Sequence, residues 1–104
     1  MNLSGHAEGA VRRWLDALDP GTRDSRLSVL GEFCARVGRA PDELVNDCLR
    51  RLDSGRFTLR TKARQRYISA IAEFEAAGAG RAAGNVVRSF FIHNGIPMQA
   101  PLVR

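Results

Sequence analysis

Apolar residues recur along most of the chain at intervals of three and four positions, which is the spacing of one face of an α-helix. Val11, Trp14 and Leu15 show this spacing near the N-terminus, and similar stripes follow in four later segments. No segment shows the strict alternation of a β-strand over any length. The pattern therefore predicts five helices, at about residues 7–18, 22–37, 40–52, 58 or 61 to 77, and 81–94.

Local signals for helix ends agree with these segments. Thr22 is a good N-cap residue for the second helix, and Gly38 supplies the left-handed C-cap that a helix end favours. Pro41 suits the first turn of the third helix, and residues 78–80 (Gly-Ala-Gly) form a turn before the fifth. Short turns between amphipathic helices predict an all-α fold, a compact bundle of four to five short helices around one core. The residues expected in this core are Val11, Trp14, Leu15, Leu18, Leu27, Leu30, Phe33, Cys34, Val37, Leu44, Val45, Cys48, Leu49, Leu52, Ala63, Tyr67, Ile68, Ile71, Phe74, Ala83, Val87, Phe90 and Phe91.

The domain organisation follows from the two ends of this pattern. We expect residues 1–6 to form a flexible N-terminus and residues 7–95 to form the helical domain. Residues 96–104 contain two prolines and no helical period, so we expect a linker that leaves the domain. No window reaches the ~18 apolar residues of a membrane span, and the N-terminus lacks the apolar run of a signal peptide. The expected compartment is therefore the cytoplasm, with no membrane partner.

The net charge of +5 is unevenly distributed along the chain. Residues 1–55 hold eight arginines and nine acidic residues, whereas residues 56–104 hold seven arginines, Lys62 and only two acidic residues. The excess of positive charge therefore lies in the second half. Such an asymmetry is typical of proteins that bind a polyanion.

Few residues in the chain suit catalysis or metal binding. His6 and His93 are the only histidines, and His93 is expected to cap the C-terminal end of the fifth helix. Cys34 and Cys48 lie within apolar helical stripes and lack CxxC spacing, so we interpret them as structural core thiols. We therefore expect no enzyme activity, no metal and no cofactor.

Basic and amide side chains gather on three of the predicted helices. In the fifth helix, Arg81, Asn85 and Arg88 recur at i, i+4 and i+7, and these residue types contact guanine and adenine edges or phosphates. The second helix opens on a turn with two arginines, and the fourth opens on a basic cluster with no acid before Glu73. Both features favour an anionic ligand. The predicted partner is double-stranded DNA, and the predicted contact residues are Thr22, Arg23, Arg26, Arg60, Lys62, Arg64, Arg66, Arg81, Asn85 and Arg88.

Two stretches of the chain resemble a known family. The first contains Trp14, residues 22–27 (TRDSRL), Phe33 and residues 41–44 (PDEL), and the second contains Tyr67, Ile71, Gly78, Arg81 and residues 85–91 and 94–97. In this order the chain is similar to the SAM-like, N-terminal core-binding domain of tyrosine recombinases and phage-type integrases. The resemblance implies one half of a clamp around DNA, acting in DNA integration or recombination, with other recombinase protomers on the DNA as further partners.

The chain departs from the family pattern in two respects. The family often has tyrosine where Arg26 stands, and its catalytic arginine, lysine, histidine and tyrosine belong to a second, C-terminal domain to which no part of this sequence corresponds. Tyr67 is the only tyrosine, and its place on an apolar stripe indicates a core residue and not a nucleophile. We therefore expect a DNA-binding module that is a monomer in isolation and does not cut DNA.

Two other functions stay open at this point. A helical protein-interaction or regulatory module without DNA binding would use an exposed apolar patch. Val86 and Ile92, which fall off the main stripe of the fifth helix, are the candidates for such a patch. A helix-turn-helix regulator would use residues 78–80 as its turn, although the long fourth helix and the missing dimerisation segment argue against it.

Overall fold

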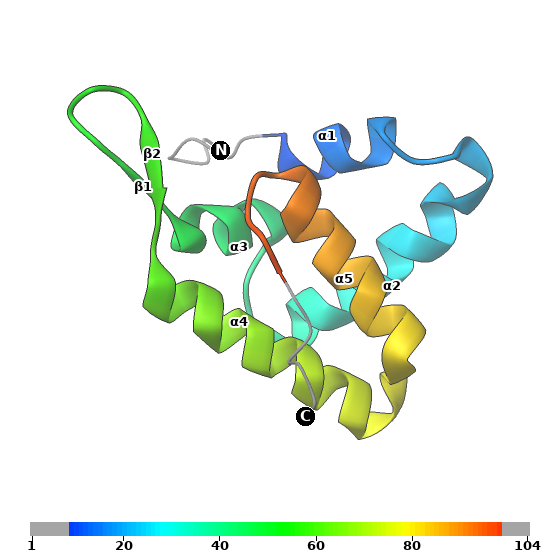
Figure 1. The fold of residues 1–104 in the computed structure, drawn as a ribbon. Coiled ribbons are helices and arrows are strands. Elements are labelled where there is room, and N and C mark those ends of the chain that lie inside the picture. Colours follow the sequence, from blue (N-terminus) through cyan, green and yellow to red (C-terminus); the bar gives the residue numbers. More distant parts are fainter. Residues whose placement is uncertain (1–8, 99–104) are drawn as a thin grey trace.

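Five α-helices and one β-hairpin follow one another along residues 9–98, the part of the chain that the computed structural model describes (Figure 1). This architecture confirms the mainly α-helical fold class predicted from the apolar pattern. The helices surround one core, and the hairpin projects from it between the third and fourth helices (Figure 1). The elements are α1 (Ala10–Asp16), the 3-10 turn η1 (Pro20–Thr22), α2 (Arg23–Val37), α3 (Pro41–Cys48), β1 (Leu49–Arg51), β2 (Phe57–Leu59), α4 (Thr61–Phe74), the π-type turn η2 (Glu75–Ala79) and α5 (Gly80–His93).

The ends of α2 and α3 lie where local signals in the sequence predict them. α2 begins directly after Thr22 and ends before Gly38, whose φ of 72° lies in the left-handed region. Pro41 is the first residue of α3, and the Glu43 carboxylate accepts a hydrogen bond of 2.7 Å from the Ala40 N–H. The carbonyl end of α2 and the amide start of α3 are thus satisfied locally, whereas Thr22 takes the N-cap position of α2 without a side-chain cap hydrogen bond.

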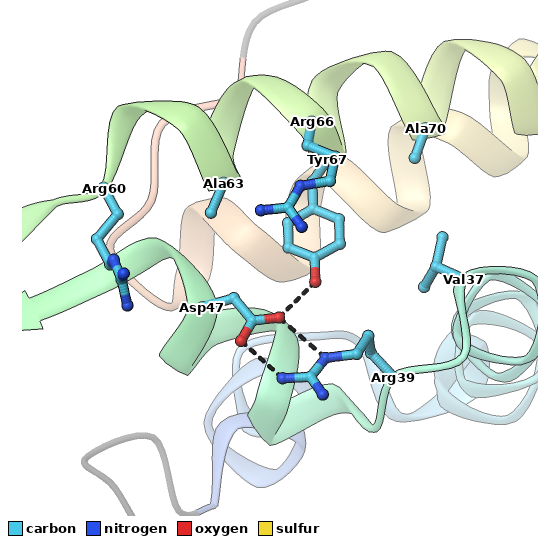
Figure 2. Close-up of a pocket in the computed structure, with 8 residues that line it drawn as sticks. All are labelled: Val37, Arg39, Asp47, Arg60, Ala63, Arg66, Tyr67 and Ala70. Atoms are coloured by element: carbon cyan, nitrogen blue, oxygen red, sulfur yellow. Dashed lines mark hydrogen bonds and ion pairs between the residues drawn. The ribbon is translucent and has the colours of Figure 1, made fainter.

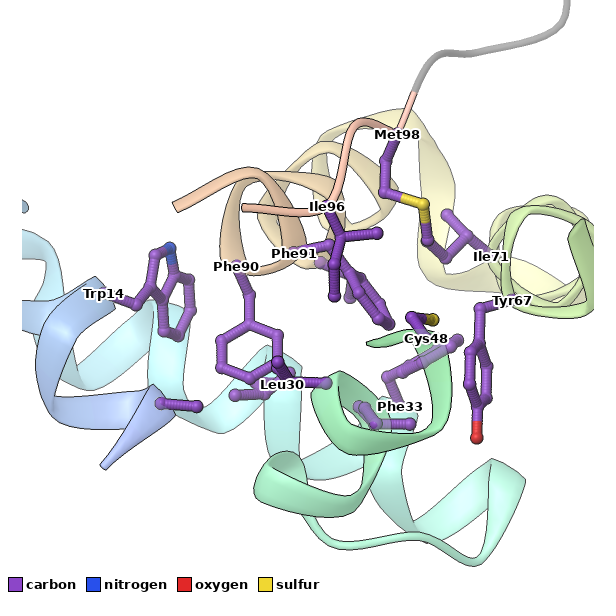
Figure 3. Packing of buried hydrophobic residues seen from close by; sticks show 14 of the residues in the cluster. Trp14, Leu30, Phe33, Cys48, Tyr67, Ile71, Phe90, Phe91, Ile96 and Met98 are labelled. Carbon is purple, nitrogen blue, oxygen red and sulfur yellow. The ribbon is translucent and has the colours of Figure 1, made fainter. Parts of the chain in front are cut away.

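Aromatic side chains from four helices make up much of the core (Figure 3). Trp14 meets Phe90 edge to face with ring centroids 5.5 Å apart, and Phe33 meets Phe74 in the same way. The indole N–H of Trp14 donates a hydrogen bond of 3.1 Å to Ser89 Oγ, which satisfies its one polar group. The buried apolar residues are Ala10, Trp14, Leu30, Phe33, Leu44, Val45, Cys48, Ala63, Tyr67, Ile71, Phe74, Val87, Phe90, Phe91, Ile96 and Met98.

Leu27 was predicted to lie in the core, and this prediction is wrong because its side chain is 41% exposed. The buried face of α2 is centred on Leu30 and Phe33. Leu27 and Cys34 are seven positions apart and therefore lie within ~20° of one another around the helix. Cys34 is itself only half-buried, so both residues lie at the edge of the buried face.

The third predicted helix is shorter than expected, because the chain leaves it for a β-hairpin. α3 ends at Cys48, and the next three residues pair antiparallel with β2, with Leu49 opposite Leu59. Gly55 closes the hairpin in the left-handed region with a φ of 87°, and its N–H donates to the Leu52 carbonyl at 2.9 Å. Strands of three residues are too short to show the alternation that would have predicted them. Leu52, expected in the core, is 42% exposed near the hairpin turn.

The C-terminal end of the described chain folds back onto the core, so the linker predicted from residue 96 does not begin there. Gly95 adopts a left-handed φ of 85°, and the Ile96 N–H donates a hydrogen bond of 3.0 Å to the Phe91 carbonyl. This arrangement is typical of a helix end at which the chain reverses direction. Ile96 and Met98 are consequently buried beside Phe91 and Ile71 (Figure 3).

The remaining boundaries differ from prediction by a few residues. α1 begins at Ala10 and ends at Asp16, two residues before Leu18, and α4 begins at Thr61 with Arg60 in the cap position. The expected flexible segment 1–6 and residues 99–104 of the expected linker lie outside the described residues. Within residues 9–98, no helix has the length and apolar character needed to cross a membrane.

Candidate nucleic-acid interface

The densest group of basic side chains lies on the β-hairpin and the first two turns of α4. Residues 49–66 hold seven basic residues against the single acid Asp53. Because β2 leads directly into α4, the hairpin and the start of this helix form one continuous end of the domain (Figure 1). We call this surface the basic edge, and its cations are Arg50, Arg51, Arg56, Arg60, Lys62, Arg64 and Arg66.

Most cations of the basic edge have no carboxylate partner. Arg64 donates a hydrogen bond of 2.7 Å from Nε to the Pro97 carbonyl, and the guanidinium of Arg66 lies 5.9 Å from the ring centroid of Tyr67. Among residues 9–98, no acceptor or acid pairs with the side chains of the other five, which are Arg50, Arg51, Arg56, Arg60 and Lys62. All five are exposed to solvent. Their positive charge is therefore available to an anion.

A shallow groove of about 370 Å³ runs between the hairpin and the start of α4. Arg50, Arg60 and Lys62 contribute cations to its lining, and Thr58 and Thr61 contribute hydroxyl groups. Among the described residues, no acid lines it. Cationic and hydroxyl donors around one groove are the groups with which proteins hold DNA phosphates.

A larger pocket of about 560 Å³ lies on the other side of Arg60, between α3 and α4 (Figure 2). Its one carboxylate, Asp47, is fully engaged: Arg39 binds it through two hydrogen bonds of 3.0 and 2.7 Å, and the Tyr67 hydroxyl donates to it at 2.5 Å. Arg60 and Arg66 line the same pocket (Figure 2). Because Arg39 already neutralises Asp47, these two arginines give the pocket a net positive charge.

Tyr67 is placed as the sequence predicts, in the core, and it is unsuited to act as a nucleophile. Burial raises the pKa of its hydroxyl, and the hydrogen bond to the Asp47 carboxylate raises this pKa further. The phenol is therefore protonated at neutral pH and already committed as a donor.

A second groove, of about 370 Å³, joins the beginning of α2 to α5. It brings together three predicted contact residues: Thr22 and Arg26 from one side, and Asn85 from the other. Within the described residues, the Arg26 side chain has no hydrogen-bond or ion-pair partner. Asn85 Oδ1 accepts a hydrogen bond of 3.0 Å from Arg88, which leaves its Nδ2 donors for a ligand. We call this surface the α2–α5 groove.

Two predicted contact residues near this groove have contacts within the domain. Arg23 donates from Nε to the Leu15 carbonyl at 2.9 Å, and the Thr22 hydroxyl donates to the Asp19 carbonyl at 2.9 Å. Arg81 is exposed at the start of α5, as predicted.

Arg88 was predicted to lie on an exposed face of α5, and this prediction is wrong. Its side chain is buried, and Nη1 lies 2.8 Å from Glu75 Oε2. Gly84 makes this possible, because a Cβ at that position would overlap the Glu75 carboxylate. Gly84 is the signal in the sequence for this close contact. A glycine inside a helix reduces helix stability by ~1 kcal/mol relative to alanine, so its presence there usually indicates close packing.

The arginines of the hairpin were missed in the sequence. When charge is summed over the two halves of the chain, Arg50 and Arg51 fall in residues 1–55, which have no net positive charge, and Arg56 falls in the second half. The sums therefore do not show that the three arginines lie together. The run Leu-Arg-Arg-Leu-Asp-Ser-Gly-Arg-Phe-Thr-Leu at 49–59 contains the signal, because a Gly-containing loop between two short apolar segments favours a hairpin.

The cysteines and histidine of the described chain serve structural roles. Cys48 is buried and Cys34 half-buried, both as free thiols, and burial raises their pKa values to about 12 and about 11. His93 Nδ1 lies 2.8 Å from the Ser89 carbonyl, which places it as predicted at the C-terminal end of α5. Within residues 9–98, no cluster of three or more histidine, cysteine or acidic side chains is arranged to hold a metal.

Comparison of the chain with protein-family models, curated proteins and solved structures finds no match.

Proposed function

We propose that this chain is a module that binds double-stranded DNA through the basic edge and the α2–α5 groove. The observation that carries the proposal is the set of five exposed cations on the basic edge that no acid of the described chain neutralises. Arg39 and Arg88 provide the contrast, since the first pairs with the Asp47 carboxylate and the second with that of Glu75. A cluster of unpaired cations repels itself and favours a bound polyanion.

The dimensions of the domain suit a duplex. The hairpin and the start of α4 lie on one side of the molecule and the start of α2 lies on the other (Figure 1), and the longest dimension of the molecule is 41 Å. One turn of B-DNA is about 34 to 36 Å long. Two separated cationic surfaces can therefore contact phosphates about one helical turn apart on the same duplex.

Membership of the tyrosine recombinases is part of the same proposal, and it rests on the resemblance in the sequence. In such a protein this module grips DNA for integration or recombination in the cytoplasm, beside other protomers, while a separate domain cleaves the strand. The engaged, protonated state of Tyr67 supports the expectation that this chain itself does not cleave DNA.

The proposal is tested by fluorescence anisotropy with a labelled mixed-sequence duplex of about 20 base pairs. We expect a Kd in the non-specific range of about 10⁻⁴ to 10⁻⁶ M near physiological salt. The double variant Arg60→Gln, Lys62→Gln should bind more weakly and lower the slope of log Kd against log salt by about 2, since each phosphate contact contributes about 0.9.

The matched control removes the same charge elsewhere. Arg12 and Arg36 are exposed residues of α1 and α2 and lie outside both grooves. The variant Arg12→Gln, Arg36→Gln should keep most of the slope. A Kd that does not change with salt concentration, or an equal loss of DNA affinity in both double variants, would contradict the proposal.

The protein-interaction alternative has one observation in its favour. Ile92 is 52% exposed on α5, as an apolar contact residue should be. Val86, its proposed companion, is half-buried in the α2–α5 groove and lies about 120° from Ile92 around the helix axis, so the two do not form one patch. Replacing Ile92, which lies outside both grooves, with serine should leave DNA affinity nearly unchanged if our proposal holds.

A further inference from the structure

We infer that the β1–β2 hairpin enters the major groove of the bound duplex and contacts base edges there. This inference rests on the proposed function and adds to it a specificity element, since phosphate contacts alone carry no sequence information.

The hairpin is a short, hydrogen-bonded ribbon with two different faces. Arg51 stands opposite Phe57 and Arg50 opposite Thr58, and side chains alternate between the faces of a strand. Arg50 and Thr58 therefore share the face that lines the groove with Arg60 and Lys62. Arg51 lies on the opposite face. At the turn, the Leu52 N–H donates to the Arg56 carbonyl at 2.7 Å, which fixes the tip.

The hairpin exposes apolar surface beside its cations. Of the five large apolar side chains that are exposed among the described residues, three lie here: Leu52 at 42%, Phe57 at 46% and Leu59 at 37%. The apolar surface that stays exposed on a projecting ribbon favours a partner that covers it. The three arginines within eleven residues select a partner that is strongly anionic.

Duplex DNA offers both kinds of surface in one place. Its major groove is about 12 Å wide and admits a two-stranded ribbon, whereas the minor groove, about 6 Å wide, does not without deformation. Arginine binds the O6 and N7 acceptors of guanine, and apolar side chains contact the methyl group of thymine. With Arg50, Arg60 and Lys62 on the phosphates at the groove wall, Arg51 and Arg56 are the cations that extend toward the bases.

The experiment uses the whole chain and a duplex selected by it from a pool with a random core. The selected duplex is then synthesised with 7-deazaguanine, which replaces the N7 acceptor by carbon and leaves the minor-groove edge unchanged. We expect this replacement to weaken binding by about tenfold, as expected for the loss of an arginine contact to guanine. The variant Arg51→Ala, Arg56→Ala should bind both duplexes with equal, reduced affinity.

The matched control is Arg60→Gln, Lys62→Gln, which removes the same charge from the groove between the hairpin and the start of α4. This variant should bind more weakly but keep the tenfold sensitivity to 7-deazaguanine. Circular dichroism of each variant checks that the helical fold is kept, which the exposure of all four residues leads us to expect.

The outcomes separate the two proposals. Salt-dependent binding with no selected sequence, or with equal affinity of the native chain for both duplexes, would overturn the hairpin inference and leave the proposed function standing. Failure to bind any duplex at low salt would overturn both. Loss of the 7-deazaguanine effect in the hairpin variant alone would support both.

Discussion

Arg88 and Glu75 form a nearly buried ion pair in which Arg88 Nη1 lies 2.8 Å from Glu75 Oε2 and Nη2 lies 3.2 Å from Oε1. The two side chains are only 8% and 15% exposed. Glu75 begins the turn η2 after α4, whereas Arg88 lies in the middle of α5. The pair therefore fixes the reversal of the chain between these two helices, and Arg88 has a structural role.

The first prediction follows from this role. Arg88→Ala leaves the Glu75 carboxylate without its cation in a poorly hydrated place, so it should reduce the free energy of unfolding by about 3 kcal/mol. Thermal denaturation should show a loss of more than ~10 °C in Tm. DNA affinity, measured well below the lowered Tm, should change little.

Arg81→Ala is the matched control on the same helix. Arg81 is exposed, has no partner within residues 9–98 and directly precedes Ala82, which lines the α2–α5 groove, so its loss should leave Tm nearly unchanged and weaken DNA binding instead. A variant at Arg88 that keeps its Tm but loses DNA affinity would show that the ion pair is not its main role.

The second prediction concerns Gly84, over which the Glu75 carboxylate lies. Gly84→Ala should displace Glu75 and separate it from Arg88, at a net cost of about 1 to 3 kcal/mol in unfolding free energy. Gly31→Ala is the control, since Gly31 lies in α2 with open space around its Cα. That variant should gain about 0.5 to 1 kcal/mol from helix propensity. Urea denaturation of both distinguishes packing from propensity, and a stabilised Gly84→Ala would refute the packing role.

The third prediction concerns the segment after α5. Ile96 is fully buried, so Ile96→Ala should cost about 2 to 4 kcal/mol in unfolding free energy. Ile92→Ala, on the exposed side of α5, should cost less than ~0.5 kcal/mol. Equal, small effects of the two changes would indicate that residues 96–98 are not part of the domain.

The fourth prediction concerns the pH dependence of the two thiols. Burial raises the pKa of Cys34 from 9.0 to about 11 and that of Cys48 to about 12. Between pH 9.0 and these raised values, the folded protein keeps thiol protons that the unfolded chain has lost. The free energy of unfolding should therefore have its full value below pH 9.0 and fall as the pH rises toward 12. Ellman's reagent at pH about 8 should react with the folded protein at least tenfold more slowly than with the unfolded chain.

Single cysteine-to-serine variants assign this behaviour to each thiol. The variant that keeps only Cys48 should react more slowly than the one that keeps only Cys34, because Cys48 is fully buried. Fast reaction of both variants at neutral pH would contradict the buried placement.

Part of the candidate site was predictable from basic residues that lie close together in the sequence. The cluster Arg60, Lys62 and Arg66 was found because basic residues close in sequence at the start of one helix are also close in space. Arg26 and Asn85 were each predicted, but their meeting across the α2–α5 groove depends on how the two helices pack. The contribution of Arg50 to the groove between the hairpin and α4 was missed, since it depends on the strand that places Arg50 beside Thr58.

The sequence by itself determined the helices, their caps and most of the core, because these follow from signals a few residues apart. Gly38 ends α2 and Pro41 begins α3 through their own backbone preferences. Only the tertiary structure decided the positions of Arg88 and Ile96. An arginine has the same local pattern whether it meets water, phosphate or Glu75, and an isoleucine after a helix enters the core only if the chain turns back at Gly95. The position of each of these side chains depends on which residues, distant in the sequence, pack beside it. Periodicity along the chain carries no information about such long-range contacts.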